Sequence, residues 1–180
     1  MKLQSRDGMF FELTIMGYQF ENSPDKDYDS NWLLIKIEAH DAQGAWSSID
    51  PSLLTYEVEE LAEWFKNLGE FERFETEVGV IEPNRFFKYR HKGKVREKIN
   101  EQAEDVETKI GFIEPNLFFK HHRNAQGDFL QIYFEYESRP SWAAGVKNFL
   151  IQFPLTELNL FDAAHSLRHQ LTRYPQRTSR

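Results

Sequence analysis

The chain has 180 residues, of which 40% are hydrophobic and 15% aromatic, a length and composition that fit one domain rich in β-strands. Its 22 basic and 29 acidic residues give a net charge of −7, which argues against nucleic acid as a partner, because phosphate binding needs a basic surface. The absence of cysteine excludes disulfides and thiolate chemistry, and without an apolar leader or membrane-length run the sequence predicts a cytoplasmic protein that binds no membrane.

The first half of the chain alternates between apolar and polar residues, which predicts strands. Residues 9–20 and 32–40 carry apolar side chains at every second position. A turn at residues 41–44 then returns the chain into a strand near Trp46, and Asp50-Pro51 is expected to close this hairpin. Between the first two strands, residues 21–30 predict a loop.

Residues 55–68 predict the first helix. Thr55 has the character of an N-cap, acidic residues fill the first turn, and Gly69 is expected to end the helix. One face is apolar and comprises Val58, Leu61, Ala62, Phe65 and Leu68. The opposite face is polar and comprises Glu57, Glu60, Glu63 and Asn67.

Two decapeptides repeat each other along the chain. Residues 79–88 read Gly-Val-Ile-Glu-Pro-Asn-Arg-Phe-Phe-Lys, and residues 111–120 read Gly-Phe-Ile-Glu-Pro-Asn-Leu-Phe-Phe-Lys. The match indicates a tandem duplication, but two copies are too few for a solenoid. We expect two repeated strands, 75–91 and 107–123, each bent at its proline, since proline cannot donate to a strand ladder.

An inserted helical segment is predicted between the repeated strands, at residues 92–109, although a frayed hairpin over residues 88–99 fits the pattern too. Six basic residues at every second position from Lys88 to Lys98 could contact nucleic acid or an acidic partner. Acidic residues follow them at once and cancel their charge, which favours a solvated linker.

The C-terminal third predicts a hairpin, a strand and a helix. A turn at residues 124–128 leads into a strand at 129–136, and another strand follows at 148–153. The last helix begins at Thr156 or Asn159 and places Leu160, Phe161, Ala164, Leu167 and Leu171 on one face. The sequence thus predicts a single α+β domain over residues 1–175, with an antiparallel sheet of about six to seven strands against two to three helices, and a disordered tail at 176–180.

Three groups of residues could bind a metal or carry out catalysis, and each lacks part of the pattern. Asp25, Asp27 and Asp29 have calcium-loop spacing, but Ser30 replaces the turn glycine and Lys36 the bidentate glutamate. The pair His165 and His169 lacks a third zinc ligand, and the neighbours His121 and His122 point to opposite faces of a strand. We therefore expect no catalytic residue, no metal and no cofactor.

Six stretches of the chain resemble the WapI family of bacterial immunity proteins. They are residues 3–8 (Leu-Gln-Ser-Arg-Asp-Gly), 29–33 (Asp-Ser-Asn-Trp-Leu) with 46–48 (Trp-Ser-Ser), 54–61 (Leu-Thr-Tyr-Glu-Val-Glu-Glu-Leu), 112–117 (Phe-Ile-Glu-Pro-Asn-Leu) and 153–155 (Phe-Pro-Leu). The duplicated Glu-Pro-Asn strand departs from the single strand of the family pattern. The resemblance implies non-enzymatic binding and neutralisation of a cognate toxin C-terminal domain.

Toxins of this kind are often nucleases with basic clefts, and an acidic inhibitor is steered onto such a cleft. We therefore expect the toxin-binding residues in the acidic loop and on the acidic helix face, and a protein that is a monomer or weak dimer. The candidates are Glu21, Asp25, Asp27, Tyr28, Asp29, Glu57, Glu60 and Glu63.

Two other functions remain open on the sequence alone. The many aromatic residues would suit a small-molecule-binding or enzymatic α+β domain with an aromatic cleft, although aromatic stripes more often form a core. The duplicated strand would suit an interaction subunit that pairs with another chain through a sheet edge.

Overall fold

The computed structural model describes residues 1–21, 29–78 and 106–177. Two antiparallel four-stranded sheets form in these residues, with the orders β1-β2-β3-β4 and β5-β6-β7-β8. The first sheet comprises β1 (Lys2–Gln4), β2 (Phe10–Tyr18), β3 (Trp32–His40) and β4 (Ala45–Leu54). The second comprises β5 (Val106–Gly111), β6 (Leu117–Asn124), β7 (Gly127–Phe134) and β8 (Phe149–Pro154).

The described helices are α1, α2 and four short 3-10 turns. Their bounds are α1 (Thr55–Val78), α2 (Leu160–Leu171), η1 (Asp29–Asn31), η3 (Tyr136–Ser138), η4 (Ser141–Ala143) and η5 (Leu155–Glu157). The α+β prediction is confirmed. The described strands number eight and lie in two sheets, where the sequence predicted one sheet. Alternation of apolar and polar residues shows that one face of a strand is buried, but it does not show which element covers that face.

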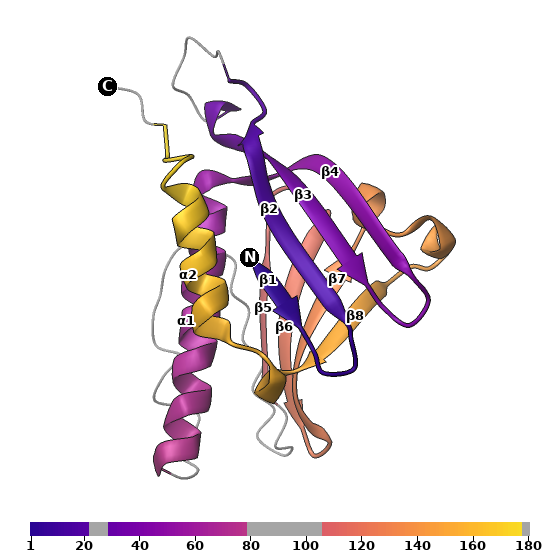
Figure 1. Ribbon diagram of the computed structural model, residues 1–180, viewed down its shortest axis with the longest axis vertical. Coiled ribbons are helices and arrows are strands. Elements are labelled where there is room, and N and C mark those ends of the chain that lie inside the picture. Colours follow the sequence, from indigo (N-terminus) through magenta and orange to yellow (C-terminus); the bar gives the residue numbers. More distant parts are fainter. Residues whose placement is uncertain (22–28, 79–105, 178–180) are drawn as a thin grey trace.

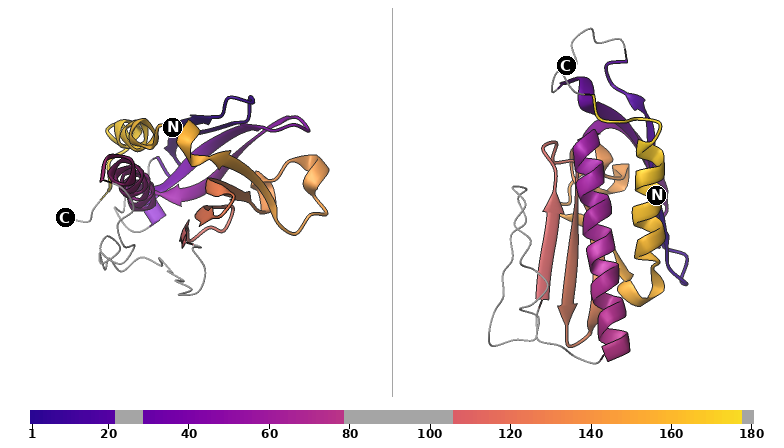
Figure 2. Two further views of the ribbon diagram at one scale, coloured as in Figure 1. Left: turned by 90° about the horizontal axis from the view of Figure 1, so that it is seen from below. Right: turned by 90° about the vertical axis from the view of Figure 1, so that its left-hand side faces the viewer.

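The core lies between the two sheets. Phe11 of β2 meets Phe119 of β6 and Phe134 of β7 edge to face, with ring centroids 5.8 and 5.9 Å apart. Helices α1 and α2 run side by side along one side of this sandwich (Figures 1 and 2). Phe65 of α1 reaches Phe119 at 5.6 Å, so α1 fills the open side between the sheets and extends the aromatic core.

The prediction that Gly69 ends the first helix is wrong, because α1 continues to Val78. Gly69 faces α2, where an added Cβ would lie 3.1 Å from the ring of Phe161 and 3.4 Å from Cβ of Leu160. The missing side chain lets the two helices approach closely. Phe161, expected on the buried face, covers this contact while remaining 40% exposed.

The second decapeptide is a hairpin and not one bent strand. β5 ends at Gly111, β6 begins at Leu117, and Gly111 pairs with Phe118, so Pro115 lies in the turn, where no ladder donor is needed. In the first copy of the predicted strand, residues 75–78 are the helical end of α1. Residues 79–91 and the inserted segment up to residue 105 lie outside the described residues, and residues 106–109, predicted to end that helical segment, belong to strand β5.

Strand β4 continues through Pro51, where the sequence predicted the end of the hairpin. Its register against β3 shifts between Leu33 and Leu34, so Leu53 pairs with Leu33 and Pro51 with Leu34. β4 is an edge strand, and a proline on an edge with a bulge removes no donor that the sheet requires.

The C-terminal segment is hydrogen-bonded to the rest of the fold beyond the point where the sequence predicts a disordered tail. Asn159 caps α2 by accepting a hydrogen bond from the Asp162 amide at 3.1 Å. Arg177, which falls in the predicted disordered tail, donates its amide to Asn31 Oδ1 at 2.7 Å and its guanidinium to the Phe20 carbonyl at 2.8 Å. The tail prediction is therefore wrong for Arg177, and residues 178–180 lie outside the described chain.

Candidate functional site

The turn at residues 112–116, which contains the second Glu-Pro-Asn, is bonded to the start of α1. The Ile113 amide donates to Glu57 Oε1 at 2.7 Å, and the Leu54 amide donates to Glu57 Oε2 at 2.9 Å. The Glu57 side chain is buried, and burial raises the pKa of its carboxyl although both hydrogen bonds act to lower it. Glu57, predicted to face a toxin, is buried and joins two parts of the fold.

On its other side the same turn holds the segment after β7. The carbonyl of Asn116 accepts hydrogen bonds from the Glu135 amide at 2.9 Å and from Ser138 Oγ at 2.5 Å. Trp46 of β4 donates its indole N–H to the Ser138 carbonyl at 3.0 Å. Between these anchors Tyr136 adopts a φ of 49°, a left-handed conformation that costs free energy for any residue but glycine.

These contacts create an exposed surface that we call the Glu-Pro-Asn end. Ile113 is 55% exposed and Tyr136 57% exposed, although both belong to tightly bonded segments. Glu114 follows Ile113 in the chain, Glu135 and Glu137 flank Tyr136, and Glu60 is close enough to Glu57 for its charge to raise the pKa of that carboxyl. None of the four forms an ion pair with a residue in the described part of the chain.

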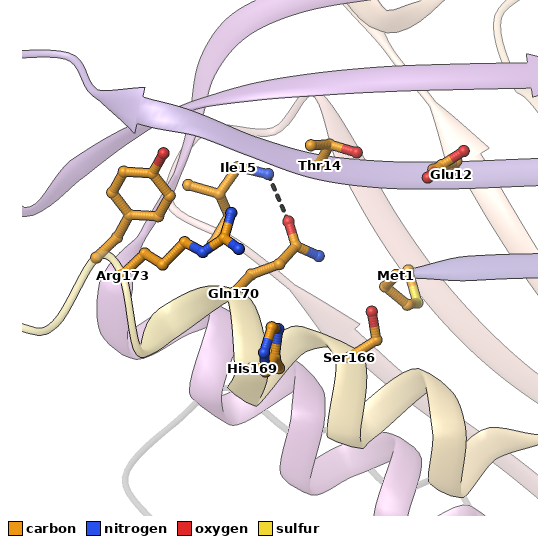
Figure 3. Close-up of a pocket in the computed structure, with 9 residues that line it drawn as sticks. Met1, Glu12, Thr14, Ile15, Ser166, His169, Gln170 and Arg173 are labelled. Atoms are coloured by element: carbon orange, nitrogen blue, oxygen red, sulfur yellow. Dashed lines mark hydrogen bonds between the residues drawn. The ribbon is translucent and has the colours of Figure 1, made fainter.

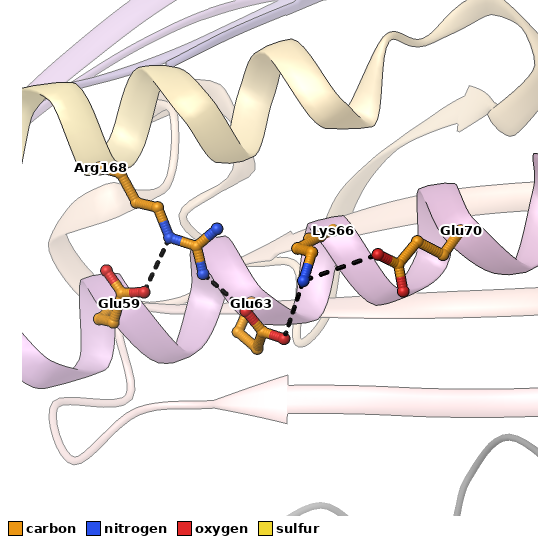
Figure 4. Close-up of polar contacts among 5 residues, drawn as sticks. All are labelled: Glu59, Glu63, Lys66, Glu70 and Arg168. Atoms are coloured by element: carbon orange, nitrogen blue, oxygen red, sulfur yellow. Dashed lines mark hydrogen bonds and ion pairs between the residues drawn. The ribbon is translucent and has the colours of Figure 1, made fainter.

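The carboxylates along the middle of α1 are paired with cations. Arg168 of α2 donates Nε to Glu59 at 2.8 Å and Nη2 to Glu63 at 2.6 Å, and Lys66 lies between Glu63 and Glu70 (Figure 4). The two carboxylates raise the pKa of the Arg168 guanidinium. Glu63, a predicted toxin contact, therefore serves the α1–α2 contact and has its charge balanced within the fold.

The two described ends of the acidic loop lie near the start of α1. Glu21 and Asp29 are exposed at its two ends, and Asn31 beside it accepts a hydrogen bond from the Thr55 hydroxyl at 3.1 Å. In Figure 1 the C-terminal end of β2 lies at the end of the molecule where α1 begins. The candidates Asp25, Asp27 and Tyr28 lie outside the described residues. The structure thus places Glu21, Asp29, Glu57 and Glu60 toward one end.

A cavity of about 280 Å³ lies between β2 and α2 (Figure 3). Gln170 lies across this cavity and bonds the part of β2 that extends beyond the short strand β1. Its side-chain oxygen accepts from the Ile15 amide at 2.7 Å, and its side-chain NH2 donates to the Leu13 carbonyl at 3.3 Å. Glu12, His169 and Arg173 add polar groups to its lining. The lining is mostly polar and differs from the aromatic cleft that a small-molecule site was expected to use.

A second charged cluster lies at the far end of β6. The buried His121 ring contacts Asp128, and Arg123 Nε donates to the other oxygen of Asp128 at 2.9 Å. Burial raises the pKa of Asp128, but the hydrogen bonds and charges of His121 and Arg123 outweigh it, so this pKa is lowered. Asp128 was not among the residues predicted to interact from the sequence. The register of the predicted hairpin, which places Asp128 opposite Arg123, could have revealed this pair.

No group of three side chains among residues 1–21, 29–78 and 106–177 could hold a metal ion. His165 and His169 are both exposed on α2. Across the same described residues, neither helix combines the length and apolar character needed to cross a bilayer.

A family model of the immunity protein WapI-like family matches residues 2–108 and 95–175. The chain belongs to this family. The two matches share residues 95–108, and each contains one copy of the repeated decapeptide, as expected for a WapI-like protein with an internal duplication. No curated protein matches the chain.

Proposed function

We propose that this WapI-like protein binds the toxic domain of a cognate bacterial toxin in the cytoplasm and neutralises it as a stoichiometric inhibitor, without catalysis. The single observation that carries the proposal is the family match, which spans residues 2–175 in two parts. The described geometry agrees with this role, since its main clusters of polar side chains serve to hold secondary-structure elements together.

The blocked activity is that of a nuclease. Nuclease clefts are basic because they hold phosphate, and the net charge of −7 on this chain would steer it onto such a cleft. Of the predicted contacts, Glu21, Asp29 and Glu60 are exposed, and Asp25 and Asp27 lie outside the described residues. Glu57 and Glu63 act indirectly, by holding α1 in place.

The proposal is tested by expressing the toxin domain encoded in the adjacent gene with and without this protein. We expect growth only when both are present, and a complex of the two on a sizing column. Equal killing in both cultures together with separate elution would overturn the proposal.

The steering role is tested by a variant in which Asp25, Asp27 and Asp29 are changed to Asn. We expect a lower association rate with little change in dissociation, and a weaker dependence on salt. The matched control changes Glu12, Glu38 and Glu70 to Gln, which removes the same charge from other positions on the surface. Equal association rates for the two variants would show that the loop has no special part in steering.

A further inference from the structure

We infer that the surface of this protein that holds the toxin is the Glu-Pro-Asn end, with Ile113 and Tyr136 as its apolar contacts. The inference rests on the proposed function, and it moves the main contact away from the acidic loop. The occupant is a basic protein surface, that of the cognate toxin domain, with an apolar depression that receives the two side chains.

The backbone of this end is ordered before any partner arrives. Glu57 holds the Ile113 amide at 2.7 Å, and the Asn116 carbonyl holds the Glu135 amide at 2.9 Å. A surface built in this way loses little conformational entropy when it binds, so more of the contact free energy appears as affinity. Both hydrogen bonds involve the turn that contains the second Glu-Pro-Asn. This turn therefore joins β5 to β6 and also fixes the backbone of the binding surface.

Two large side chains are held in solvent at this end. Ile113 and Tyr136 are each more than half exposed, and the bonds around Ser138 keep Tyr136 at a φ of 49°. Strained backbone that the surrounding structure over-determines tends to occur where a protein binds something. Tyrosine is also enriched among the residues that dominate binding energy.

The charge around these two side chains selects the kind of partner. Glu60, Glu114, Glu135 and Glu137 have no ion pair within the described residues, whereas Glu59 and Glu63 on the same helix as Glu60 are bound by Arg168. The negative potential therefore remains available at the Glu-Pro-Asn end and is largely cancelled beside α2. A basic surface is complementary to the first region and not to the second.

The test measures binding to the purified toxin domain from the adjacent gene, using the full-length chain. Ile113→Ser and Tyr136→Ala should each weaken binding by at least tenfold. The matched control is Ile49→Ser on β4, where the isoleucine is 56% exposed against 55% for Ile113. This control should bind within twofold of wild type.

Circular dichroism melts check that each variant is folded. The double change Glu60→Lys, Glu137→Lys is a second test of the surface, because it alters charge without changing the hydrogen-bonded backbone. It should lower the association rate at least tenfold at low salt. If wild type binds and all these variants bind equally well, the contact lies elsewhere and the inference is overturned while the proposed function stands. If wild type itself does not bind, the proposed function fails and the inference with it.

Discussion

The two ends of β6 are built differently, although both are hairpin turns. Before Leu117 the chain makes a broad turn over residues 112–116, which exposes Ile113 and is held by Glu57 from α1. After Asn124 the strand turns tightly into Gly127, and Asp128 is held by His121 and Arg123. At the end after Asn124, the Asp128 carboxylate is paired within the fold. At the end before Leu117, carboxylates and apolar side chains remain exposed to solvent.

This difference separates structural acidic residues from those that can meet a partner. A carboxylate that already accepts hydrogen bonds inside the protein has little left to offer a ligand, and its loss affects folding first. An exposed carboxylate without a partner contributes little to stability and much to steering. Stability measurements on variants at each end of β6 test this separation.

The largest expected effect is that of Glu57→Ala. The substitution leaves the Leu54 and Ile113 amides without their acceptor, so the free energy of unfolding should fall by about 2–4 kcal/mol. Urea unfolding measures this loss. Glu60→Ala, three residues along the same helix and exposed, should change stability by about 0.5 kcal/mol or less. A similar loss for both would show that Glu57 has no special structural role.

At the other end, Asp128→Asn should lower the free energy of unfolding by about 1.5–3 kcal/mol, because it removes the negative charge and replaces one of the two oxygens that contact His121 and Arg123 with an NH2 group. The same urea experiment measures it. Asp29→Asn, at an exposed carboxylate, is the control and should change stability by about 0.5 kcal/mol or less. Unchanged stability in Asp128→Asn would mean that the hairpin does not depend on its charged cluster.

Backbone conformation supplies a smaller, paired prediction. Gly127 has a φ of 141°, and an added Cβ would lie 3.1 Å from the Phe129 ring, so Gly127→Ala should cost about 1–2 kcal/mol. Tyr136→Gly should keep stability or raise it by up to about 1 kcal/mol, because glycine relieves the strain at a φ of 49°. Thermal melts compare the two. A clear loss of stability in Tyr136→Gly would show that the tyrosine is held for the fold and not for a partner.

The last prediction concerns sign. The folded pKa of Asp128 lies below its usual 3.8, so its stabilisation is full above that value and is lost as pH falls through the folded pKa. The folded pKa of Glu57 lies above its usual 4.5, so its contribution is full below that value and declines as pH rises through the folded pKa.

Lowering the pH from about 7 to about 3 should therefore shrink the stability difference between wild type and Asp128→Asn and enlarge that between wild type and Glu57→Ala. Urea unfolding curves at several pH values measure both differences. Parallel trends in the two variants would contradict the contrast between the two ends of β6.

Local patterns in the sequence were sufficient for several of the secondary-structure elements. Alternating apolar residues predicted β2 and β3, a short polar turn predicted the β6–β7 hairpin, and Asn159 was one of two predicted caps for α2. These features depend on neighbours a few residues apart, so a sequence reveals them. Glu57 shows where local patterns fail. Its position on the polar face of the helix predicted an exposed side chain, but the turn at residues 112–116, far away in the sequence, covers it.

The sequence alone predicted β2, β3, the β6–β7 hairpin and α2, the acidic charge, the duplication and the resemblance to WapI-like immunity proteins, since each is a property of composition or of short-range order. Only the tertiary structure decided that the strands form two sheets, that Gly69 brings two helices together, and which carboxylates are used inside the fold. The physical reason is that burial and hydrogen bonding depend on residues far apart in the chain, such as Glu57 and Ile113, which come together only on folding.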